Sequence, residues 1–157
     1  MGNELYSCFK RIKVDKLDEV DKIELLNIFL VTKEPRIRNH IAFIFSDVGY
    51  DDAIPQVLKK IQEKSLFNKN GSLVYSLKNL KTQDYFFEFV KLVCTQAYEA
   101  RLSAYEILKK DINKINLTVK KRSLSFIKKY YKENKLSLSS GKDERYTMIK
   151  EVITMLS

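Results

Sequence analysis

Few residues in this sequence have the chemistry for acid–base, nucleophilic or metal-dependent catalysis. His40 is the only histidine, so a Ser–His or Cys–His pair would have to use it, and a site built from several histidines is excluded. Its spacing places His40 between Ile37 and Ile41, at the edge of a helix face. We therefore interpret it as a partly buried, hydrogen-bonded structural histidine.

The two cysteines, Cys8 and Cys94, belong to no CxxC pattern or other ligand spacing. Cys94 follows the apolar run Phe86–Val93, and Cys8 stands beside Phe9. Because free cysteine is among the most buried residue types, we expect two small buried hydrophobic side chains. A disulfide between them is the alternative, since the sequence does not exclude it.

Phosphate binding and carboxylate catalysis have no clear signature either. The four glycines are too far apart to form a phosphate-binding loop. Asp51 and Asp52 are neighbouring carboxylates, but their place before a helix pattern favours turn and capping roles. We therefore expect a protein that is not an enzyme and that has no metal and no cofactor.

Positive charge is the strongest chemical signal, with a formal net charge of +9. Residues 1–80 contain 13 basic and 11 acidic side chains, whereas residues 81–157 contain 16 and 9. Between residues 109 and 135, ten basic side chains stand against only Asp111 and Glu133. Such asymmetry favours a polyanionic partner surface. A solvated face with no partner is the alternative.

The elements that must position this charge are helices. Apolar residues recur at spacings of three and four almost throughout, and only four glycines and two prolines interrupt them. A chain of 157 residues fits one domain. No apolar run approaches the roughly 18 residues of a membrane span. Residues 1–10 also lack the basic region and apolar run of a secretory signal. We therefore expect a cytoplasmic protein with no membrane partner.

The first long helix is predicted to begin near residue 21. Asp21 is placed to cap it, with Glu24 bonding back to the cap. Ile23, Leu26 and Leu30 then form its apolar stripe, with Leu25 and Phe29 widening it, and we expect this face to pack on the core.

Residues 34–61 predict two antiparallel helices joined by a short turn. Pro35 stands in the first turn of the first helix, where its missing N–H costs nothing. Gly49 ends that helix at a position that favours a left-handed residue. Asp52 is expected to cap the second helix. The buried face of the second helix is expected to carry Ile54, Val57, Leu58 and Ile61.

The same pattern returns after a shift of 32 residues without a gap. The aligned apolar pairs are Ile41 with Leu73, Phe45 with Leu77, Val48 with Leu80, Ile54 with Phe86, Val57 with Phe89 and Ile61 with Val93. A fainter third unit begins at Ala97. Periods in this range indicate a stacked array in which each helical pair shields its neighbours.

Residues 34–61 resemble a HEAT repeat. The resemblance rests on Pro35-Arg36-Ile37-Arg38, Asp47-Val48-Gly49 and Asp52-Ala53-Ile54-Pro55. Residues 70–93 and 97–131 resemble weaker copies, and the second copy lacks the proline and arginine at the helix start. The resemblance implies an all-α fold, a short α-solenoid of about three HEAT-like αα-hairpins with N- and C-terminal capping helices.

The resemblance also implies how a single domain of residues 1–157 is divided. Its expected parts are N-terminal capping helices in 1–33, repeat units 34–66, 69–95 and 97–133, a Ser- and Gly-rich loop at 135–141 and a C-terminal capping helix in 142–156.

In HEAT-like stacks the second helix of each unit usually lines the concave surface. The rows expected to lie side by side there are Gln56, Lys59 and Glu63, then Glu88, Lys91 and Thr95, then Lys121, Ser125, Lys128 and Lys132. The partner-binding residues expected from these rows are Lys59, Lys91, Lys121, Lys128 and Lys132.

Small stand-alone stacks of this kind resemble bacterial immunity proteins, which neutralise a partner toxin by covering its active surface. The resemblance implies a non-catalytic, antitoxin-type protein whose partner is another protein with an acidic surface. The alternative is nucleic-acid binding through the basic face of residues 109–135, with Tyr130 and Tyr131 supplying stacking. The HEAT-like alkylpurine DNA glycosylases fit poorly, because this chain looks too short, has no Trp and offers no placeable catalytic Asp.

Overall fold

The computed structural model describes residues 2–138 and 144–157, with side chains for residues 6–134 and 144–157, and all its regular secondary structure in these ranges is helical. The α-helices are α1 (Gly2–Phe9), α2 (Glu19–Val31), α3 (Pro35–Asp47), α4 (Ile54–Ile61), α5 (Gly71–Ser76), α6 (Phe86–Thr95), α7 (Tyr98–Asp111), α8 (Leu117–Leu138) and α9 (Glu144–Leu156). Short 3-10 segments cover Val14–Lys16, Asp51–Ala53, Lys64–Leu66, Leu77–Asn79, Gln83–Tyr85 and Ile112–Lys114. The all-α class expected from the sequence is confirmed.

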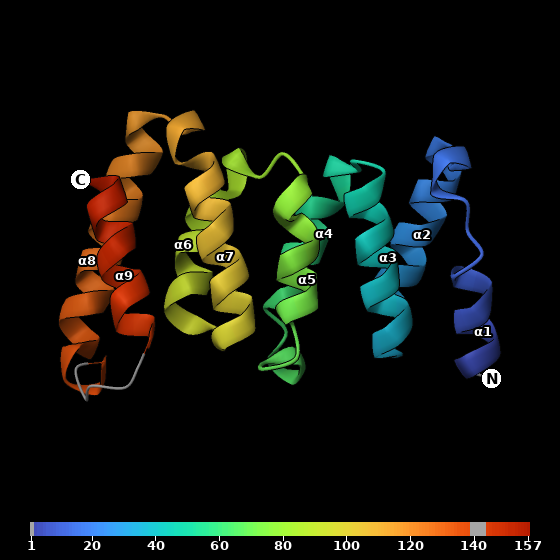
Figure 1. Ribbon diagram of the computed structural model, residues 1–157, viewed down its shortest axis with the longest axis horizontal. Coiled ribbons are helices and arrows are strands. Elements are labelled where there is room, and N and C mark those ends of the chain that lie inside the picture. The colour runs from blue at the N-terminus through green and yellow to red at the C-terminus, as the bar shows by residue number, and fades with distance from the viewer. Residues whose placement is uncertain (1, 139–143) are drawn as a thin grey trace.

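The helical pairs follow one another along the long axis of the molecule in chain order, with α6 lying beyond α7 and α8 beyond α9 (Figure 1). Helices α1 and α2 lie at one end, and α8 and α9 lie at the other. Successive odd-numbered helices contact each other, from α1 with α3 through to α7 with α9. Each even-numbered helix packs against an odd-numbered one, α2 on α3, α4 on α5, α6 on α7 and α8 on α9. We call these two sets the odd row and the even row.

The hydrophobic core draws on both rows. Phe29 and Phe45 are fully buried, and Phe86 and Phe89 are at most 1% exposed. The ring of Phe29 in α2 meets that of Phe45 in α3 edge to face, with centroids 6.0 Å apart. Burial of each such side chain contributes roughly 1.5–3 kcal/mol. Apolar packing between neighbouring helices therefore holds the array together.

The hairpin of α3 and α4 begins and turns as its sequence predicts. Pro35 occupies the first turn of α3. Gly49 has a φ of 64°, a left-handed conformation that a residue with a Cβ adopts only at a cost. The N–H of Tyr50 then donates to the carbonyl of Phe45 at 2.9 Å, closing the end of the helix. The expectation for Gly49 is confirmed.

Helix α4 begins without the expected cap. Asp52 lies in the 3-10 segment Asp51–Ala53, and the N-cap position of α4 is Ala53, with no side-chain hydrogen bond. The prediction that Asp52 caps α4 was therefore wrong. In the 3-10 turn the Ala53 N–H donates to the backbone carbonyl of Tyr50. The carboxylate of the neighbouring Asp51 accepts a hydrogen bond from the next unit, from the Lys81 N–H.

Helix α2 differs from its prediction in both cap and buried face. Asp18 is the N-cap and forms a reciprocal capping box with Asp21. Leu25 and Phe29 are buried, whereas Ile23 and Leu30 are 52% and 38% exposed. The predicted stripe was therefore right for Leu25 and Phe29 and wrong for Ile23 and Leu30, because α2 is apolar on several sides and spacing alone does not select the side that packs.

The C-terminal boundaries also shift. Helix α8 continues to Leu138, so the predicted loop at 135–141 is helical over its first part. The remaining loop residues, 139–141, lie outside the described residues, as do 142 and 143 of the predicted capping helix. The described part of that helix is α9, Glu144–Leu156. Each predicted unit, 34–66, 69–95 and 97–133, encloses one odd-row helix and all or most of one even-row helix.

Helices α5 and α7 approach each other closely at their starts. A Cβ at Gly71 would lie 2.8 Å from the Cβ of Glu99 and 2.9 Å from its Oε2. Real side chains do not tolerate such a distance, so glycine permits this contact. Gly71 therefore helps to set the spacing between neighbouring odd-row helices.

Candidate partner-binding site

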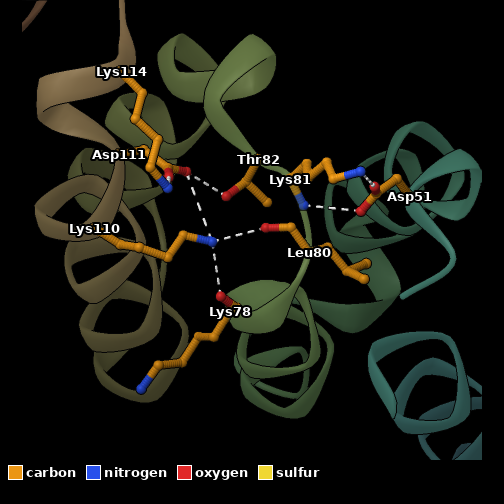
Figure 2. Close-up of polar contacts among 8 residues, drawn as sticks. All are labelled: Asp51, Lys78, Leu80, Lys81, Thr82, Lys110, Asp111 and Lys114. Atoms are coloured by element: carbon orange, nitrogen blue, oxygen red, sulfur yellow. Dashed lines mark hydrogen bonds and ion pairs between the residues drawn. The ribbon is translucent and has the colours of Figure 1, made fainter. Parts of the chain in front are cut away.

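The connection that leads into the basic helix α8 is fixed by a buried carboxylate. Asp111, the last residue of α7, is fully buried. Its Oδ2 accepts a hydrogen bond from the Thr82 hydroxyl at 2.5 Å, and its Oδ1 accepts from Lys114 Nζ at 3.0 Å (Figure 2). Both carboxylate oxygens thus have partners, and Asp111 acts as a structural tie between two connections.

Lys110 extends this tie to the turn between α5 and α6. Its Nζ donates to the carbonyls of Lys78 and Leu80 at 2.8 Å each, and lies 3.9 Å from Asp111 Oδ2 (Figure 2). Burial lowers the pKa of Lys110, and the nearby Asp111 opposes that shift. The ammonium therefore supplies hydrogen-bond donors to two carbonyls in the turn that follows α5.

Three of the five predicted partner-binding lysines share one face of α8. Lys121, Lys128 and Lys132 are all exposed, and their helical spacing puts them on the side opposite the buried Ser123. The described part of the chain supplies no ion pair or hydrogen bond to any of their ammonium groups. We call these three residues the lysine row.

The other two predicted lysines lie on different even-row helices. Lys59 is exposed on α4. Lys91 on α6 is half-buried, pairs with Glu88 at 2.5 Å and lies 5.4 Å above the Phe87 ring. Because Glu88 offsets its charge, Lys91 offers less to a partner than the lysine row does. The site thus centres on α8.

Sequence reasoning missed a cluster that joins α6 to α8. The guanidinium of Arg122 lies 4.0 Å from the Phe87 ring centroid, and Phe126 meets the same ring edge to face at 5.4 Å. Cation–π contacts of this kind contribute about 0.5–1 kcal/mol at exposed sites. The only signal was the four-residue spacing of Arg122 and Phe126, which did not reveal Phe87 as the partner.

The tyrosines predicted to stack on nucleic acid bases are both half-buried. The hydroxyl of Tyr130 donates to the Cys94 carbonyl at 2.7 Å, and that of Tyr131 donates to the Tyr146 hydroxyl at 3.0 Å. Their rings therefore pack against neighbouring helices. This arrangement leaves them poorly placed as a stacking platform.

The residues with potential for catalysis are dispersed. His40 Nε2 lies 3.2 Å from the Phe9 carbonyl, and the ring stacks edge to face on Tyr6, as expected for a structural histidine. Both cysteines are free. Burial raises the pKa of Cys94 to about 12, whereas Cys8 is exposed, so the expectation that Cys8 is buried was wrong. The described residues include no group of three metal-ligating side chains.

No family model matches this chain, and no curated protein or solved structure matches it significantly. Within the described residues, no helix has both the length and the apolar character needed to cross a membrane. Function must therefore be inferred from the chain's own residues and geometry.

Proposed function

We infer that this chain is a short α-solenoid of HEAT-like αα-hairpins. Hydrogen bonds among the helix ends and connections of successive helical pairs support this, because they join residues 29–33 positions apart. They are Lys60 with the Leu30 carbonyl, Asn79 with Ser46, Lys81 with Asp51, Lys110 with the Leu80 carbonyl and Thr82 with Asp111. A recurring separation of this size is typical of stacked repeats.

Burial at corresponding positions supports the same architecture. Ile41 and Leu73, which are 32 residues apart in the odd row, are both fully buried. Val57 and Phe89, which are 32 residues apart in the even row, are at most 1% exposed. Each unit thus uses equivalent positions to cover its neighbours. On this basis α1, α2 and α9 are the capping helices.

We propose that the protein is a non-catalytic protein-binding module of the immunity or antitoxin type, which neutralises a toxin by covering its active surface. The observation that carries the proposal is the lysine row, three exposed ammonium groups on one face of α8 that have no partner among the described residues. A rigid helical array loses little ordering entropy on binding. Its partner is a protein with an acidic patch opposite α8, with Lys59 and Lys91 as secondary contacts.

Nucleic-acid binding through residues 109–135 is less well supported. Its proposed stacking residues, Tyr130 and Tyr131, are engaged internally. The arginine in this segment, Arg122, is stacked on Phe87. Phosphate contacts from lysines alone would remain, and these carry no sequence information.

The proposal can be tested by affinity capture from the native cells after nuclease treatment, with bound proteins identified by mass spectrometry. We expect a stoichiometric protein partner, retained less well by the variant Lys121→Glu/Lys128→Glu/Lys132→Glu. The matched control, Lys13→Glu/Lys16→Glu/Lys64→Glu, changes the charge equally at exposed lysines outside α8. An eluate with nucleic acid before nuclease treatment and nothing afterwards would overturn the proposal.

A further inference from the structure

A groove of about 800 Å³ lies at the other end of the array from α8. It forms where the end of α2, the start of α3, the end of α4 and the following connection meet. Its volume is within the usual range of ligand sites, roughly 300–1,000 Å³. No residue of the lysine row lines it.

Arg38 is the unusual residue of this groove. Its side chain lines the groove, the residue is only 5% exposed, and its Nε has no hydrogen-bond partner within the part of the chain that the structure describes. Glu63 and Glu34 act on it only at a distance, and burial lowers the pKa of the guanidinium despite them. Burying a charge without a partner costs free energy. The other buried charge discussed above, Asp111 in α7, has partners on both carboxylate oxygens. A ligand that supplies an acceptor would remove that cost.

Further positive charge surrounds Arg38. Lys33 and Lys69 line the groove, are exposed and have no ion-pair partner in the described ranges. Lys60 is held by the Leu30 carbonyl at 3.2 Å and by Glu63 at 3.0 Å. Four cationic side chains and one carboxylate therefore line the groove, which makes it attractive to an anion.

The groove also has apolar walls, which narrow the class of anion. Leu30 and Val31 are 38% and 77% exposed and line its α2 side, and Leu66 lines the opposite side. Exposed apolar side chains beside a polar site mark surfaces that a partner covers. Inorganic phosphate would leave these walls exposed, and Glu63 would repel its larger negative charge more strongly than a single carboxylate. A carboxylate flanked by apolar groups fits both features.

We propose that this groove binds an acidic peptide segment of a protein partner. A glutamate or aspartate carboxylate of the segment accepts hydrogen bonds from Arg38, and its flanking apolar side chains cover Leu30 and Val31. The buried Oδ1 of Asn39, which has no partner, accepts a backbone N–H of the segment. The proposal concerns a surface separate from the lysine row and does not depend on the function proposed for that row.

The test is a titration of the ¹⁵N-labelled full chain with a capped pentapeptide that carries one glutamate between leucines. We expect the Arg38 Nε–H signal to shift, and the matched glutamine peptide to bind about tenfold more weakly or worse. Equal binding of the two peptides, a stronger response to inorganic phosphate, or no shift of the Arg38 signal would each overturn the proposal.

Variants separate a binding role from a structural one. Arg38→Met should lose the preference for the glutamate peptide while its thermal midpoint stays the same or rises, because it removes an unpaired buried charge. If Arg38→Met fails to fold, Lys33→Gln/Lys69→Gln decides, since both side chains are exposed. This double variant should remain folded and bind the glutamate peptide several-fold more weakly, and unchanged affinity would overturn the proposal.

Discussion

Asp111 and Arg38 are two buried charged residues with opposite surroundings. Asp111 accepts hydrogen bonds on both oxygens, from Thr82 and Lys114, so its burial supports the fold. Arg38 has an Nε without a partner among the described residues and lines a groove. Its burial therefore gains no hydrogen bond that would stabilise the fold. At the residue scale, pairing distinguishes a structural charge from one available to a ligand.

Removal of the Asp111 carboxylate should destabilise the fold strongly. Asp111→Ala leaves the Thr82 hydroxyl and the Lys114 ammonium without their acceptor, at a cost of about 3–5 kcal/mol in the free energy of unfolding. Urea denaturation followed by circular dichroism measures this loss. Thr82→Val, which removes one neutral donor, should cost less. A loss below about 1 kcal/mol for Asp111→Ala would contradict the role assigned to this carboxylate.

The two cysteines should differ in reactivity. Cys94 is fully buried, and its pKa is raised to about 12, so a thiol reagent at pH 8 should modify exposed Cys8 alone in the native protein and both residues in denaturant. Mass spectrometry counts the labels. Rapid native labelling of Cys94 would show that its helix opens readily.

The same raised pKa predicts a pH dependence of stability. The stability that Cys94 contributes as a neutral thiol is complete below its unfolded pKa of 9.0 and is lost as pH rises toward about 12.

At the scale of single elements, the sequence predicted helices better than it predicted their faces and ends. Helix α3 followed from Pro35 and Gly49, because both residues act through their own backbone chemistry. The buried face of α2 followed only in part, since Ile23 and Leu25 are equally apolar and only the position of α3 selects between them. The end of α8 was missed because a helix, once formed, gains a hydrogen bond with each added residue and extends through serines.

The contact between α5 and α7 depends on a missing side chain. Gly71→Ala would place a methyl group 2.8 Å from Glu99 Cβ, so we expect a loss of about 1–3 kcal/mol in the free energy of unfolding. Thermal unfolding of the variant measures it. Adding Glu99→Gly should recover part of the loss, whereas Glu99→Ala, which keeps the Cβ, should recover little. A Gly71→Ala variant as stable as the parent chain would show that the two helices move apart without cost.

At the scale of the whole molecule, charge could be predicted from the sequence and the groove could not. The lysine row follows from the spacing of Lys121, Lys128 and Lys132, which any helix over these residues would place together. The groove brings together two segments that are separate in sequence, residues 30–39 and 60–69. Arg38 gave no signal of its own, because it looked like one of several basic residues at a helix start.

Binding through the lysine row should depend on salt. The affinity of the captured protein partner, measured by titration calorimetry, should fall as the salt concentration rises, because exposed charges are screened. The variant Lys121→Glu/Lys128→Glu/Lys132→Glu should have lost this salt-sensitive part, whereas Lys13→Glu/Lys16→Glu/Lys64→Glu should keep most of it. The same salt response in both triple variants would place the contact elsewhere on the molecule.

The most direct measurement is growth of cells that express the captured partner together with this protein. If the protein neutralises a toxin through α8, the parent chain and the Lys13→Glu/Lys16→Glu/Lys64→Glu control should restore growth. The Lys121→Glu/Lys128→Glu/Lys132→Glu variant, present in equal amount, should protect less. A partner that does not impair growth by itself, or equal protection by all three chains, would contradict the account.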